Sequence, residues 1–124
     1  MEYKFIVPAE DFGNPVPYLR TTQGSKWTKK YQRYVAWKDW VESHFIEQIG
    51  KMPCQGFKIN QKYHVKTMMF FKNNAHADPD NVQKGIKDAI FSKPLSDKYC
   101  SGEYDFGYDP KNPRVEVEII ERTE

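Results

Sequence analysis

The chain has 124 residues, and its 19 Lys and Arg residues against 17 Asp and Glu give a formal net charge of +2. This length supports one hydrophobic core, so we expect a single domain over residues 1–124. A hydrophobic content of 39% with 29% charged residues excludes disordered and collagen-like chains. The longest purely apolar run, residues 68–71, is too short to cross a bilayer, and no secretory signal is visible, so we expect a cytoplasmic protein without membrane contact.

The first half of the chain predicts a strand, a loop and a helix. Residues 2–8 alternate between apolar and polar side chains, which is typical of a half-buried strand. Residues 9–28 contain several prolines and glycines and predict an extended loop long enough to be functional. Thr28 is suited to cap a helix that runs to about Gln48, with Gly50 just beyond its end. The expected core stripe of this helix is Tyr31, Tyr34, Trp37, Val41 and Phe45.

The second half predicts a strand over residues 57–71, a helix, and a closing strand over 113–121. Asp80 heads the expected helix, with Gln83 completing a capping arrangement, and Pro94 stops it by Ser92 or Lys93. Residues 96–112 form a polar connecting segment. The order of elements predicts an α+β fold, a small mixed or antiparallel sheet with two main helices in a single, dimer-forming domain.

Charge is distributed unevenly along the chain. Residues 1–75 carry 12 Lys and Arg against 6 Asp and Glu, whereas residues 76–124 carry 7 against 11. Between Phe12 and Lys38 there are six cations, no carboxylate, and several interleaved aromatic residues, a composition typical of nucleic-acid binding. A solvated helix face is the alternative interpretation. The candidate DNA-binding residues are Arg20, Lys26, Lys29, Lys30 and Arg33.

Two carboxylates stand where the long strand passes into the second helix. Pro79 restricts the backbone between Asp78 and Asp80, and hard oxygen donors at such a junction suit Mg²⁺. Lys84 follows Asp80 by one helical turn, and its ammonium is expected to return toward the carboxylates and hold a phosphate. A capping Asp with an Asp80–Lys84 ion pair on the helix surface is the structural alternative.

These residues resemble the RusA family of Holliday junction resolvases, whose signature is D-x-D-N-x-x-K-x-x-x-D-A. Residues 78–89 read DPDNVQKGIKDA. Residues 14–17, with Arg20 and residues 27–31, resemble the proline-rich and basic N-terminal segment of the family, and residues 112–117 resemble its closing strand. The resemblance therefore extends over nearly the whole chain.

The resemblance implies a homodimeric, Mg²⁺-dependent endodeoxyribonuclease, with Mn²⁺ as a substitute metal, that acts in DNA recombination and repair. Such enzymes resolve four-way DNA junctions by paired symmetric nicks that leave 5′-phosphate and 3′-hydroxyl ends. The family's metal ligands correspond to Asp78, Asp80 and Asp97, and its essential lysine corresponds to Lys84. Ser96 stands where the family usually has the first acid of a pair, which leaves Glu103 and Asp105 as substitutes for the third carboxylate.

Several alternatives remain open from sequence. A non-catalytic DNA-binding or accessory protein with the same fold is the main rival, and a flap or single-strand nuclease is a further one. His76 is interpreted as a loop histidine without a functional role. The alternative is that it acts as a general base or as a partner of the aspartates. The aromatic residues of 98–109 are interpreted as facing the core or a dimer interface, with base stacking as the less favoured use.

Overall fold

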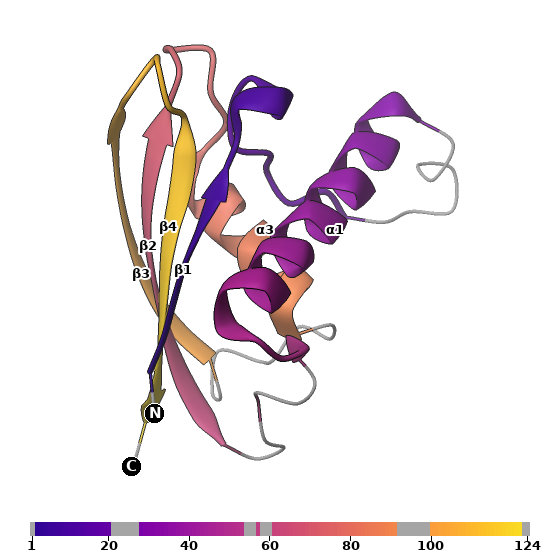
Figure 1. The fold of residues 1–124 in the computed structure, drawn as a ribbon. Helices are drawn as coiled ribbons and strands as arrows, with labels where there is room; N and C mark the ends of the chain where they lie inside the picture. The colour runs from indigo at the N-terminus through magenta and orange to yellow at the C-terminus, as the bar shows by residue number, and fades with distance from the viewer. Residues whose placement is uncertain (1, 21–27, 54–56, 58–60, 92–99, 123–124) are drawn as a thin grey trace.

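The computed structural model describes residues 2–20, 28–53, 57, 61–91 and 100–122, and every structural statement below concerns these residues. It is an α+β domain in which two helices cover one face of a four-stranded mixed sheet (Figure 1). The elements in chain order are strand β1 (Glu2–Pro8), a short 3-10 helix (Glu10–Phe12), helix α1 (Lys29–Ile49), strand β2 (Lys62–Phe71), helix α3 (Pro79–Phe91), strand β3 (Cys100–Tyr108) and strand β4 (Arg114–Arg122). None of the helices is long and apolar enough to span a bilayer.

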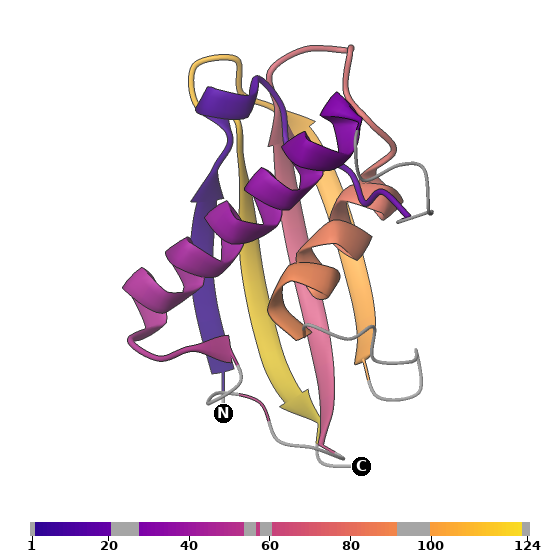
Figure 2. The ribbon, with the colours of Figure 1, turned by 90° about the vertical axis from the view of Figure 1, so that its right-hand side faces the viewer.

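The strand order across the sheet is β1-β4-β2-β3. β4 pairs antiparallel with both β1 and β2, and β2 pairs parallel with β3. α3 joins the two parallel strands, because a parallel connection has to cross from one end of the sheet to the other. α1 and α3 both begin at the end of the molecule where β2 and β3 finish (Figure 2). The helix starts and the carboxyl ends of the parallel strands therefore share one end of the fold.

The predicted limits of the first strand and first helix are confirmed. Thr28 Oγ1 accepts a hydrogen bond from the Tyr31 N–H at 3.2 Å, which satisfies one of the free amides at the start of α1. Gly50 ends the helix with a φ of +87°, a backbone conformation that glycine adopts without steric cost. Four of the five expected stripe residues of α1 are buried, namely Tyr34, Trp37, Val41 and Phe45.

The second half differs from the prediction at two places. β2 begins at Lys62 and not at Phe57, whose ring packs edge-on against Tyr3 and Tyr63 in the core. Residues 100–108, expected as a connecting segment, form strand β3. Only Cys100 of this strand is buried, since β3 lies at the sheet edge and has a neighbour on one side alone. Its aromatic residues at 104, 106 and 108 alternate with polar or glycine residues, a strand signal that the interpretation of this segment as a polar connection did not use.

A buried polar contact joins the two helices. Tyr34 of α1 donates a hydrogen bond to Asp88 of α3 at 2.6 Å, and Lys38 forms an ion pair with the same carboxylate at 3.1 Å. Burial, together with the hydrogen bond to Asp88 and its negative charge, raises the pKa of the Tyr34 phenol well above its ordinary value. Asp88 therefore holds α3 against α1, and its carboxylate is not among the exposed groups at the start of α3.

Replacing Tyr34 by Phe is expected to lower the free energy of unfolding by about 1.5–3 kcal/mol at pH 8, because a hydrogen bond to a charged acceptor is lost. Below pH 10 the tyrosine is protonated in both the folded and the unfolded chain, so its full contribution is present. Above pH 10 only the unfolded chain releases the proton, and the stability gap between parent and Tyr34→Phe should shrink by up to ~1.4 kcal/mol per pH unit. Urea unfolding of both proteins at pH 8 and pH 11 measures this gap, and a gap that widens at pH 11 would contradict the assignment.

Candidate metal and nucleic-acid site

Asp78 caps the N-terminus of α3. The helix begins at Pro79, a favoured residue at the first helical position. Asp78 Oδ1 accepts a hydrogen bond from the Asp80 N–H at 3.0 Å, and the Asp78 carbonyl accepts from the N–H groups of Asn81 and Val82. The prediction that Asp80 is the capping residue is therefore wrong by two residues, since Asp80 is the second residue of the first turn. Both carboxylates lie at the positive end of the helix dipole, where negative charge stabilises the helix.

The two carboxylates are exposed at this helix start. Asp78 uses one oxygen for the cap and keeps the other available. Within the described ranges, no group donates a hydrogen bond to the Asp80 carboxylate and no cation pairs with it. The site therefore presents carboxylate oxygens that no cation of the described residues neutralises.

Gln83 has a different role from the one predicted. Instead of completing a cap, its side chain is buried and its Nε2 donates to the carbonyls of Val65 and Glu103, at 3.2 and 2.7 Å. Val65 lies on β2 and Glu103 on β3, so one amide group fixes α3 to both parallel strands. This contact sets the position of the helix start relative to the sheet.

Replacing Gln83 by Leu is expected to destabilise the fold by about 1–3 kcal/mol, since a carbonyl acceptor loses its partner in a partly buried place. The shape of the side chain is nearly kept, so the change reports on the hydrogen bonds. Chemical unfolding of both proteins measures the difference. Hydrogen exchange should also become faster in β3, and unchanged stability would mean that these two bonds contribute nothing.

Lys84 does not form the ion pair with Asp80 that the structural alternative to a phosphate-holding role required. Its Nζ lies 5.0 Å from the centre of the Tyr18 ring, a cation–π contact. Tyr18 is held by its backbone N–H, which donates to the Asn81 carbonyl at 2.8 Å. A Cβ at Gly85 would lie only 3.2 Å from that nitrogen, so glycine at this position permits the close approach. Lys84 is exposed one helical turn after Asp80, and no described carboxylate forms an ion pair with it.

The N-terminal loop packs against the segment that leads into α3. Asn14 accepts a hydrogen bond from the Lys72 N–H at 2.6 Å and donates to Asn73 Oδ1 at 3.2 Å. Together with the Tyr18 contact, this places residues 14–20 along the start of α3. The two segments that carry the sequence resemblance are thus brought together from positions about sixty residues apart in the chain.

His76 is held by aromatic neighbours. Its ring stacks on Phe71 with centroids 3.9 Å apart and planes 9° apart. Its Nδ1–H donates to the Ala77 carbonyl at 2.7 Å, so in the neutral ring Nε2 accepts from the Tyr108 hydroxyl at 2.9 Å. Both ring nitrogens are therefore used. His76 fixes the loop before Asp78 onto β3, a contact that the sequence did not predict.

The predicted DNA-binding residues differ in whether their side chains already bind another part of the protein. Arg20, Lys29 and Lys30 are exposed, and the last two occupy the first turn of α1, which contains no acidic residue. Arg33 is also exposed, but its Nη2 donates to the Phe12 carbonyl. Lys26 lies outside the described residues. Lysine in the first turn of a helix is unfavourable to the helix dipole, and the same arrangement attracts anions.

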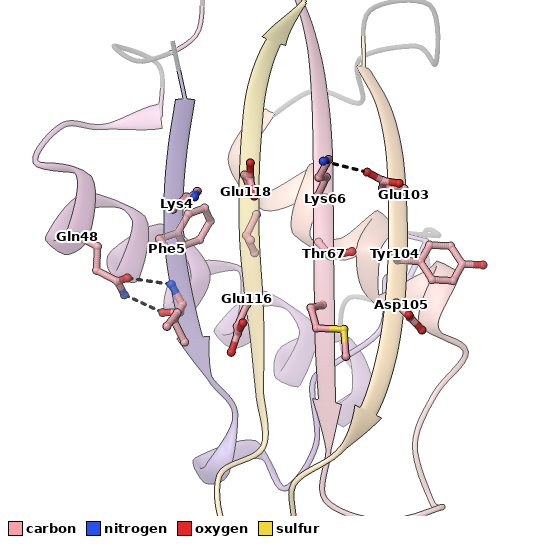
Figure 3. A pocket seen from close by; sticks show the side chains of 13 residues that line it. Lys4, Phe5, Gln48, Lys66, Thr67, Glu103, Tyr104, Asp105, Glu116 and Glu118 are labelled. Carbon is pink, nitrogen blue, oxygen red and sulfur yellow. Dashed lines mark hydrogen bonds and ion pairs between the residues drawn. The ribbon is translucent and has the colours of Figure 1, made fainter.

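The third carboxylate has no described position, because Asp97 and Ser96 lie outside the described residues. The two substitutes do not fit this site. Glu103 pairs with Lys66 at 3.4 Å on the face of the sheet opposite to the helices, and Asp105 Oδ1 accepts from the backbone N–H of Phe106. Both line a groove of about 680 Å³ on that open face, away from α3 (Figure 3). Among residues 2–20, 28–53, 57, 61–91 and 100–122, no cluster of three or more His, Cys, Asp or Glu is arranged to hold a metal ion.

The donor set at the start of α3 is suited to a hard cation. Asp78 has one carboxylate oxygen that is not engaged in the cap, and Asp80 has both. Mg²⁺ commonly binds through one or two carboxylates while keeping several waters and substrate phosphates. The two aspartates are therefore sufficient in kind and number for such a site.

No protein-family model matches the chain, and no curated protein matches its sequence.

Proposed function

We propose that this protein is a Mg²⁺-dependent, structure-specific endodeoxyribonuclease that resolves four-way DNA junctions in recombination and repair. The observation that carries the proposal is the pair of exposed carboxylates at the start of α3, with Lys84 one turn further and no cation of the described residues paired with Asp80. Uncompensated carboxylates at a helix start are common caps. When such carboxylates are accompanied by a lysine one turn later and by a basic segment nearby, a role in phosphodiester cleavage explains the combination better than capping alone.

Each group has a definite task in this proposal. Asp78 and Asp80 hold Mg²⁺, which, when bound, supplies Lewis-acid activation of the phosphodiester and of a water molecule. Lys84 stabilises the charge that develops on the phosphate oxygens. Tyr18 keeps the lysine stem beside the helix, so that its ammonium is positioned before the substrate arrives. Asp97 is proposed as a third ligand on the strength of the sequence resemblance alone.

Binding is proposed to use the basic N-terminal segment. Lys29 and Lys30 at the start of α1, together with Arg20, would contact phosphates of the DNA arms. Since such contacts release counterions, affinity should fall steeply as salt concentration rises. A homodimer is part of the proposal, because a two-fold arrangement would put two equal sites on two equivalent strands of a junction.

The test is a cleavage assay on a synthetic mobile four-way junction, with Mg²⁺ and with EDTA. The proposal predicts paired nicks in Mg²⁺ and none in EDTA, and a much lower rate on a linear duplex of the same sequence. Equal cutting of junction, duplex and flap would favour the less selective nuclease instead.

A non-catalytic DNA-binding protein is the second candidate. It is favoured by the fact that the described part of the chain brings together only two carboxylates at the start of α3. This candidate predicts that the junction is retained in a gel-shift assay and stays uncut in Mg²⁺ and in Mn²⁺.

A further inference from the structure

Three aromatic side chains lie exposed in a row on β3. Tyr104, Phe106 and Tyr108 are 45%, 41% and 49% exposed, and we call them the aromatic strip. Alternate residues of a strand point to the same face, so the three rings follow one another at intervals of about 7 Å. Their β2 partners, Thr67, Met69 and Phe71, are buried under the helices. The strip therefore lies on the helix-bearing face but extends beyond the cover that the helices give, and in Figure 3 Tyr104 points outward past β3.

α3 explains why the strip is left open. The helix reaches β3 at Gly102 and Glu103, through Lys87 and Gln83. A Cβ at Gly102 would lie 2.8 Å from Lys87 Nζ, so the lysine stem lies directly over the glycine. Lys87 forms no salt bridge with any described carboxylate. One end of the strip thus carries a cation that no carboxylate of the described residues neutralises.

The other end of the strip contacts the segment that leads to Asp78 and Asp80, the acidic pair. The Tyr108 hydroxyl bonds to His76, which is two residues before Asp78 and also lies against Phe106, with ring centroids 5.5 Å apart. Phe106 and Tyr108 meet edge to face at 6.2 Å. These contacts fix the rings of Phe106 and Tyr108 in place before any ligand binds, which lowers the entropic cost of binding.

We propose that the aromatic strip stacks unpaired bases of the DNA strand whose phosphate lies at Asp78 and Asp80. This proposal rests on the proposed function. It adds that the preferred substrate has unpaired bases beside the phosphodiester that is cut. Exposed aromatic rings beside a cation are the surface that single strands use, since every base has a face that stacks. No carboxylate in the described part of the chain pairs with Lys87, so its charge can complement a phosphate. The contact between Tyr108 and His76 connects the strip to the segment that leads to Asp78 and Asp80, beside the strand that would be cut.

A second copy of the chain fits the strip less well. If two β3 edges paired antiparallel about Tyr104, Glu103 of one copy would face Asp105 of the other, and like charges directly opposite are unfavourable. The backbone N–H of Phe106 is already bonded to the Asp105 carboxylate at 2.8 Å. The strip is therefore assigned to DNA and not to pairing of strands.

The test compares two double variants that differ in their rings. Tyr104→Leu with Phe106→Leu removes both rings, whereas Tyr104→Phe with Phe106→Tyr keeps them and serves as the control. Binding of a 20-nucleotide oligo(dT) and of a 20-base-pair duplex is measured by fluorescence anisotropy in EDTA, where no cutting occurs. Thermal unfolding of each variant is followed by circular dichroism, and its association state by sedimentation.

We expect the leucine variant to bind oligo(dT) at least tenfold more weakly than the parent, with duplex binding changed less than twofold. The control should bind both as the parent does. The proposal is overturned if the leucine variant binds oligo(dT) normally, if it loses duplex affinity equally, or if it loses a dimer while each protomer keeps its affinity for oligo(dT). If the parent protein binds oligo(dT) through the rings but never cuts a junction, the proposed nuclease function is refuted, whereas binding of single strands by the aromatic strip is supported. If the parent protein cuts junctions and the leucine variant binds oligo(dT) normally, only the base-stacking role of the aromatic strip is refuted.

Discussion

Asp78→Asn is expected to reduce the rate of junction cleavage by roughly three orders of magnitude while leaving the fold intact, since a bound metal contributes several kcal/mol to such a reaction. Asparagine keeps the side-chain oxygen that accepts the Asp80 N–H, and it caps helices as well as aspartate does. The substitution therefore removes a negative charge without removing the cap. Junction binding should stay equal or become tighter, because one carboxylate no longer repels the polyanion.

The control for this experiment is Asp39→Asn, the same chemical change at an exposed position of α1. It should leave cleavage and unfolding unchanged. Asp80→Asn should behave like Asp78→Asn, since Asp80 has no partner among the described residues that the change would disturb. If Asp78→Asn cuts the junction as fast as the parent, the carboxylate is only a cap.

Lys84→Met is expected to lower the cleavage rate by about 10²–10³-fold, the effect of removing one well-placed electrostatic donor. Methionine keeps an unbranched apolar stem that can remain against Tyr18. Loss of the cation–π contact should cost only about 0.5–1 kcal/mol of stability at this exposed place. The dependence of the rate on Mg²⁺ concentration should stay the same, because the metal ligands are untouched.

Lys51→Met provides a matched control for Lys84→Met. Lys51 also lies over a tyrosine, with its Nζ 5.2 Å from the centre of the Tyr3 ring, but it follows the C-terminus of α1. Both substitutions remove one cation–π contact and one charge. Equal cleavage by both variants, at the rate of the parent, would exclude a role for Lys84 in the chemistry.

Local sequence signals predicted the elements whose stability is local or whose side chains face the core. Thr28 and Gly50 limit α1 through contacts within a few residues, and the buried stripe of α1 repeats at helical spacing. β3 was not predicted, although its aromatic residues alternate with polar ones, because the charged and glycine residues between them indicated a polar connecting segment. Its existence depends on pairing with β2, which is about forty residues earlier in the chain.

The candidate site was predicted in its residues and only partly in its contacts. Pro79 is a signal for the first helical position that would have placed the cap at Asp78. The interactions of Gln83, Lys84 and His76 all depend on partners from other segments, and no local spacing specifies them. A capping pattern in the sequence therefore competed with a long-range contact to the sheet, and the long-range contact was the one formed.

We propose that the start of α3 holds a divalent cation. Crystals of the protein grown with Mn²⁺, with diffraction data collected at the manganese absorption edge, reveal whether it does. We expect an anomalous peak within coordination distance of carboxylate oxygens of both Asp78 and Asp80, and its loss in the Asp78→Asn protein. A clear manganese peak elsewhere with none beside these two side chains, in crystals where the start of α3 is open to solvent, would contradict it.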